Sequence, residues 1–202
     1  ALNAEPSVDL GLESGSHGFH QGRLSAAFQQ LLKSAKWRNH ISATHALTNG
    51  SNASFLGSES DGCQNRSWNA DSTLYWPDDG ELGLSVRQTR GSTDGDPQDF
   101  AFPANPTQGL VIDGDENNAV SQRLAALRGR TRTGAWLHEV MLSQNASRTR
   151  FRTNGEENSG LRGRVSKVEW TASRAFNSDV ATHSLALGMQ YEERRFRNFS
   201  AS

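Results

Sequence analysis

Short stretches in which apolar and polar residues alternate recur along the chain, and they constrain its fold more than any other feature. Successive side chains of a β-strand point to opposite faces, so a period of two predicts strands with one apolar and one polar face. The alternation is clearest at 8–12, 37–47, 68–76, 82–86 and 185–191. Helical spacing is tolerable only over 24–32. These patterns predict an all-β protein.

Four weaker stretches bring the predicted set to about nine strands, and they cover 19–28, 120–129, 135–151 and 161–172. The phase within 120–129 is ambiguous, because Leu124 and Ala126 compete with Ala125 and Leu127 for the apolar face. The phase within 135–151 is ambiguous in the same way. Many of the stretches approach the length of about 9–11 residues that a tilted, membrane-crossing strand needs.

The connections between the predicted strands differ in length in a regular way. Tight turns are expected at 77–80, 131–134 and 177–179, and long polar segments at 48–62, 91–118 and 152–160. Barrels of the bacterial outer membrane alternate short periplasmic turns with long external loops. We therefore predict an antiparallel up-and-down meander that forms part of the wall of a large transmembrane β-barrel.

The two predicted faces support this interpretation. All five tryptophans fall in the apolar phase or near predicted strand ends, where aromatic girdles of membrane barrels lie. We expect the lipid-facing set to include Ile41, Leu74, Leu84, Val86, Leu185 and Leu187, and the lumen set to include Arg38, Asp71, Glu81 and Arg87. A soluble β-sandwich with tryptophans in its core remains open as an alternative.

Composition excludes several classes of protein. No run of about 18 apolar residues is present, which excludes transmembrane helices. The single cysteine, Cys63, excludes an internal disulfide framework and a cysteine-based zinc site. The 21 basic and 22 acidic residues nearly balance, so nucleic acid is not expected as the main partner. The histidines lack metal-binding spacing and no nucleophile motif is present, so we do not expect an enzyme.

Several segments resemble the barrel of TonB-dependent outer-membrane receptors of the cobalamin and siderophore type. The segment 9–25 is similar to the strand, short turn and strand that follow the plug domain of these receptors. The runs 47–54 and 59–67 are similar to their next external loop, and 136–143 and 185–193 to later strands. The resemblance implies that residues 1–202 are part of a barrel of about 22 strands, without the plug domain and the C-terminal strands.

The resemblance also implies a function and a set of partners. The chain would belong to a receptor of the bacterial outer membrane that imports a ferric siderophore, cobalamin or a similar scarce ligand. Energy would come from the TonB–ExbB–ExbD complex through the missing plug, and the barrel would contact outer-membrane lipid. The alternatives are a passive porin or adhesin barrel, and a soluble, secreted, carbohydrate-binding β-sandwich.

The acidic segment 91–118 holds the candidate site residues. Asp94 and Asp96, with the aromatic residues Phe100 and Phe102, are predicted ligand contacts of an external loop, although both phenylalanines could also pack into the barrel rim. The carboxylates of Asp113, Asp115 and Glu116 could bind calcium, which takes oxygen ligands. A solvated, turn-rich loop without metal remains the alternative, and no other cofactor is expected.

Overall fold

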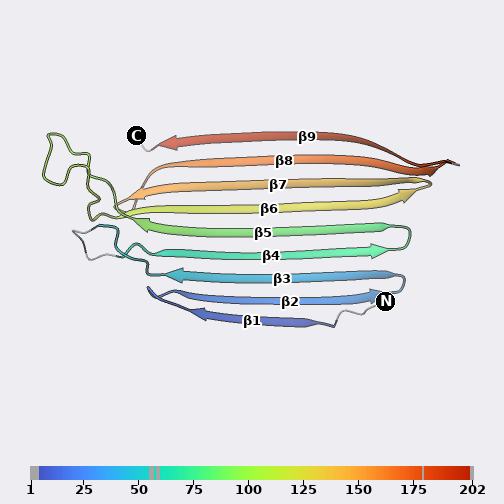
Figure 1. The fold of residues 1–202 in the computed structure, drawn as a ribbon, viewed down its shortest axis with the longest axis horizontal. Coiled ribbons are helices and arrows are strands. Elements are labelled where there is room, and N and C mark those ends of the chain that lie inside the picture. Colours follow the sequence, from blue (N-terminus) through green and yellow to red (C-terminus); the bar gives the residue numbers. More distant parts are fainter. Residues whose placement is uncertain (1–4, 55–56, 58–59, 179, 201–202) are drawn as a thin grey trace.

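The computed structural model describes residues 5–54, 57, 60–178 and 180–200 of the 202-residue chain. These residues form one antiparallel sheet of nine strands that lie side by side in sequence order (Figure 1). The strands are β1 (Ser7–Ser14), β2 (His20–Leu32), β3 (Ala35–Thr48), β4 (Cys63–Trp76), β5 (Gly80–Gly95), β6 (Glu116–Thr133), β7 (Trp136–Thr153), β8 (Glu156–Asn177) and β9 (Thr182–Ser200). The described residues include no helix that is long and apolar enough to span a membrane.

The predicted fold class, an all-β antiparallel up-and-down meander, is confirmed. The strands are longer than the alternating stretches suggested, and β8 extends over 22 residues. The reason is that the hydrogen-bonded ladder continues through residues that do not alternate. Gly160, for example, pairs with Arg150 and with Phe199, although it precedes the predicted stretch 161–172. Backbone pairing needs no hydrophobic pattern, so the pattern marks only the middle of each strand.

The two ends of the sheet carry different connections (Figure 1). At one end, here called the turn end, every connection between strands is short. At the opposite, loop end, the long loops 49–62 and 96–115 join β3 to β4 and β5 to β6. The long segment expected at 152–160 is wrong, because only Asn154 and Gly155 separate β7 from β8. Both have positive φ, 53° and 76°, and Asn-Gly is the preferred pair for such a two-residue hairpin turn.

The register assigns every strand residue to one of two faces, because residues directly opposite in an antiparallel pair project on the same side. The apolar face carries the predicted lipid-facing set, in rows such as Ile41–Ala70–Val86 and Leu84–Leu127–Leu142. The polar face carries Arg38, Asp71, Glu81 and Arg87, as expected. In β6 the register resolves the ambiguous phase, since Ala125 and Leu127 lie on the apolar face.

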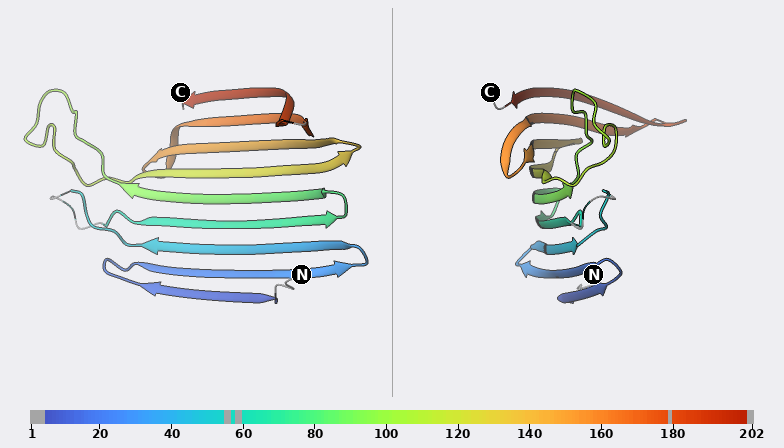
Figure 2. Two further views of the ribbon diagram at one scale, coloured as in Figure 1. Left: turned by 45° about the vertical axis from the view of Figure 1, so that its right-hand side comes forward. Right: turned by 90° about the vertical axis from the view of Figure 1, so that its left-hand side faces the viewer.

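The sheet is a single curved layer without a second layer of described residues against either face (Figure 2). Leu84, Leu185 and Ile41 are therefore 48%, 47% and 53% exposed, where a sandwich would bury them against a second sheet. β1 and β9 each pair with one neighbour within the described residues, which leaves two open edges. Open edges are an aggregation hazard that closure into a barrel removes.

Candidate functional site

The apolar face carries a band of exposed hydrophobic side chains with tryptophans at its borders. All five tryptophans lie on this face: Trp37, Trp76 and Trp136 are near the turn end, Trp68 is near the opposite border, and Trp170, which pairs with Val140, lies within the band. On β4 the band runs from Trp76 to Trp68, and both side chains are exposed (39% and 45%). The eight residue-to-residue steps from Trp68 to Trp76, at about 3.4 Å each, make the band about 27 Å long along the strand.

The polar face is crossed by charged pairs and hydrogen bonds between neighbouring strands. Arg128 on β6 forms an ion pair with Glu81 on β5, and Arg130 lies 3.8 Å from Glu139 on β7. Asp71 on β4 accepts a hydrogen bond of 2.6 Å from the Ser85 hydroxyl on β5. Charges paired in this way are stable next to water, as in the polar interior of a hydrated lumen.

A hollow of about 280 Å³ lies on the polar face near the turn end. Its lining includes Arg38, His40, Asp71 and Tyr75, which reach it from β3 and β4. The Arg38 guanidinium lies 5.3 Å above the centre of the Tyr75 ring, and His40 Nδ1 lies 3.8 Å from the Asp71 carboxylate. The hollow therefore presents both charge signs to a polar ligand or to a packed polar element.

The long loop 96–115 is organised around the buried carboxylate of Asp99. This carboxylate accepts hydrogen bonds from the Thr107 hydroxyl (2.5 Å), the Ala101 backbone N–H (2.8 Å) and the Asn105 amide (2.9 Å). The Thr107 hydrogen bond, followed by those from Ala101 and Asn105, lowers the pKa of Asp99 below its usual value. Asp99 thus keeps its negative charge and fixes the loop conformation.

The two long loops are joined to each other by Asp96. Its carboxylate accepts hydrogen bonds from the backbone N–H of Ser54 (3.0 Å) in loop 49–62 and of Gly114 (3.2 Å) in its own loop. The Ser54 hydroxyl in turn donates to the Val111 carbonyl at 3.2 Å. Asp94 accepts from the Asn117 amide at 2.7 Å, which ties the end of β5 to β6. Both predicted ligand carboxylates therefore also hold the loop end together.

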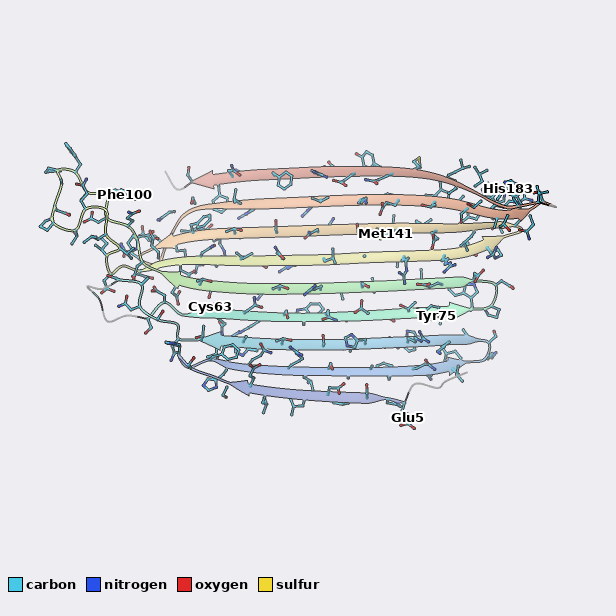
Figure 3. All side chains as sticks on the ribbon, viewed as in Figure 1. Glu5, Cys63, Tyr75, Phe100, Met141 and His183 are labelled. Atoms are coloured by element: carbon cyan, nitrogen blue, oxygen red, sulfur yellow. The ribbon has the colours of Figure 1, made fainter. Side chains whose placement is uncertain are left out.

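The predicted aromatic contacts point into solvent. The side chains of Phe100 and Phe102 are 74% and 95% exposed, and Phe100 lies well beyond the end of the sheet (Figure 3). They do not pack into the rim of the sheet in this structure. Their role as ligand contacts stays a prediction.

The structure does not gather the predicted calcium ligands. Among the described residues, no group of three or more His, Cys, Asp or Glu side chains is close enough to hold a metal ion. Asp113 lies against Gly57 of the other loop, the Asp115 carbonyl accepts from the Asn154 N–H at 2.8 Å, and Glu116 begins β6. Calcium at Asp113, Asp115 and Glu116 remains a prediction.

Two residues used in the sequence analysis lie outside the described residues. They are Glu59, in a segment that resembles a receptor loop, and Asp179, in a predicted turn.

A cluster of arginines on the apolar face was not anticipated from the sequence. It lies between the apolar band and the loop end, and we call it the arginine patch: Arg66, Arg90, Arg123, Arg148 and Arg150, which line a hollow of about 570 Å³. The arginines come from four neighbouring strands, β4 to β7, and only the register brings these strands' arginines together. The alternation in the sequence could have indicated part of this cluster, because Arg66 lies two residues before Trp68 and therefore on the same face of the strand.

No family model matches the chain, and no curated protein matches its sequence. Among solved structures, the β domain of the Bordetella autotransporter BrkA is similar, with 11% sequence identity and a TM-score of 0.42. The similarity covers 96% of this chain and 80% of the other.

Proposed function

We propose that the nine strands are a section of the wall of a wide β-barrel in a bacterial outer membrane. The observation that carries this proposal is the exposed, tryptophan-bordered band on one face of a sheet whose other face is polar. With a strand tilt of about 35–45°, the length of about 27 Å along β4 gives a band about 19–22 Å tall, near the 25 Å of known barrels. Open edges at β1 and β9 fit a section that further strands close.

The specific function that we propose is energised import of a ferric siderophore, cobalamin or a similar ligand by a TonB-dependent receptor. The sequence resemblance supports it, and so does the polar face, whose charges could contact a plug. A passive channel is the second candidate, because the ion pairs Arg128–Glu81 and Arg130–Glu139 already satisfy the polar face beside water alone. The two candidates share the barrel wall and differ in the use of energy.

Cysteine labelling tests the barrel wall in the protein as the cell makes it. In a Cys63→Ser background, single cysteines replace Leu84 on the apolar face and Ser85 on the polar face. We expect a charged, water-soluble thiol reagent to modify position 85, and a fluorophore at position 84 to be quenched by nitroxide lipids. Equal reactivity with the water-soluble reagent at both positions contradicts a membrane wall.

Uptake measurements separate the two transport functions. Cells that produce the whole protein receive radiolabelled cyanocobalamin and a panel of ferric siderophores, with and without the genes of the TonB–ExbB–ExbD complex. Energised import predicts uptake of one of these ligands that disappears without the complex. If vesicles containing the protein instead become permeable to arabinose, and no ligand depends on the complex, the passive channel is supported.

A further inference from the structure

The arginine patch sits on the face where its charge is least expected. Arg66 is only two residues beyond Trp68 on the same face of β4, so the patch borders the apolar band directly. It lies on the side of the band towards the long loops, which in outer-membrane barrels is the external side. The patch would therefore be level with the headgroups of the outer leaflet, a placement that rests on the proposed barrel wall.

The register sets several of these positive charges against one another. Arg66 stands directly opposite Arg90, and Arg148 stands opposite Arg162 on β8. Directly opposed side chains in a sheet have Cβ atoms about 5 Å apart, and like charges in such pairs destabilise the sheet. An anion bound between the opposed arginines would attract both of them and so offset their mutual repulsion.

The described residues do not provide enough negative charge to balance the patch. Glu157 is the acidic partner there, with its carboxylate 3.1 Å from Arg148 and 3.9 Å from Arg150. Among the residues described, no carboxylate lies within ion-pair distance of Arg66, Arg90 or Arg123. The Nε atom of Arg148 is buried and, within the same residues, makes no hydrogen bond.

Phosphate is the anionic group that such a patch suits best. Guanidinium groups donate paired hydrogen bonds that match the oxygens of a phosphate, and their charge persists at any physiological pH. The lining of the hollow of about 570 Å³ also includes Ser92 and Ser121, whose hydroxyls are further donors. The adjacent apolar band would cover acyl chains. Headgroup and chains together define a phosphorylated lipid.

We propose that the arginine patch binds the phosphate groups of a phosphorylated lipid of the outer leaflet, with lipid A as the probe. The acyl chains lie along the exposed apolar band, from Trp68 towards the turn end, and the phosphates lie over the strands from β4 to β7. Each arginine next to an anionic lipid contributes about fivefold in affinity, so loss of three should weaken binding by about a hundredfold.

The test uses the whole protein, purified in detergent and freed of lipid, with bound lipid counted by native mass spectrometry. The probes are lipid A, the same lipid with its phosphates removed, and inorganic phosphate. The variant carries Arg66→Gln, Arg90→Gln and Arg123→Gln. A matched control removes three positive charges from the polar face: Arg23→Gln, Arg38→Gln and Arg87→Gln. A lysine version of the first variant retains the charge.

We expect lipid A to bind the unchanged protein, the control and the lysine version, and to bind the glutamine variant about a hundredfold more weakly. Equal binding by the glutamine variant and its control would overturn the proposal, as would equal binding of dephosphorylated lipid. Displacement of lipid A by inorganic phosphate at similar concentration would overturn the choice of a lipid. Equal reactivity of cysteines at positions 84 and 85 with the water-soluble reagent would overturn the barrel wall by itself. If the labelling is as expected but the glutamine variant binds lipid A as well as the unchanged protein does, only the lipid site is overturned.

Discussion

Replacing Leu84 by arginine tests most directly whether the apolar face meets lipid. Leu84 lies at the middle of the band on β5, between Leu82 and Val86, and it stands opposite Leu127. Its side chain is 48% exposed in the isolated sheet, so no packed core opposes a longer side chain. Any large cost of the substitution must therefore come from the medium that covers this face.

The expected cost follows from the depth of the position. An arginine that faces lipid at the bilayer midplane costs about 2–4 kcal/mol, whereas a substitution on a water-exposed surface stays within about 0.5 kcal/mol. Leu84→Arg should therefore lower the folding equilibrium constant by about 30-fold to several hundredfold. Ser85→Arg is the matched control, since Ser85 is the next residue on the polar face and lies beside the Asp71 carboxylate.

Reversible urea unfolding of the whole protein in phospholipid vesicles measures both free energies. A second pair, Leu142→Arg and Ser143→Arg on β7, repeats the comparison two strands further along the sheet. If Leu84→Arg destabilises no more than Ser85→Arg, and the second pair agrees, the apolar face does not meet lipid. The proposed barrel wall would then be wrong.

Three further predictions concern the turns and loops. Gly155→Ala, at a φ of 76°, should lower the free energy of unfolding by about 1–2 kcal/mol. Gly129→Ala is the control: an added Cβ there meets nothing within 4 Å, so the free energy of unfolding should change by no more than about 0.5 kcal/mol. Urea unfolding in vesicles measures both variants. Because the pKa of Asp99 is lowered, its carboxylate stabilises loop 96–115 at pH values above its unfolded pKa of about 3.9, and this contribution is lost as pH falls through the lowered folded pKa. Carbon NMR of the Asp99 carboxyl group should show a titration midpoint below that of an unfolded peptide. A midpoint above that of the peptide would contradict the hydrogen bonds to the carboxylate. Phe100→Ser with Phe102→Ser should leave the unfolding free energy within about 0.5 kcal/mol but reduce ligand uptake, and unchanged uptake would exclude these side chains as ligand contacts.

Local alternation was enough to predict the all-β class of fold and, in most strands, which residues share a face. Alternation is a local property of one strand, so Leu84 against Ser85, or Leu74 against Thr73, can be assigned without knowledge of neighbouring strands. The tight turn predicted at 77–80 was equally local, because proline fixes its own φ whereas aspartate and glycine tolerate the positive φ that turns require. The hairpin at Asn154 and Gly155 carried the same kind of signal, and it was overlooked within a long polar segment.

Tertiary structure decided what depends on the alignment of different strands. The phase of β6 was ambiguous until pairing with β5 set Leu127 beside Leu84. The opposition of Arg66 and Arg90 also exists only in the alignment of β4 with β5, because a shift by one residue would move one of them to the other face. The hydrogen bonds of Asp96 to loop 49–62 likewise join segments far apart in sequence. Register and loop contacts are set by packing between strands, which no single stretch of sequence encodes.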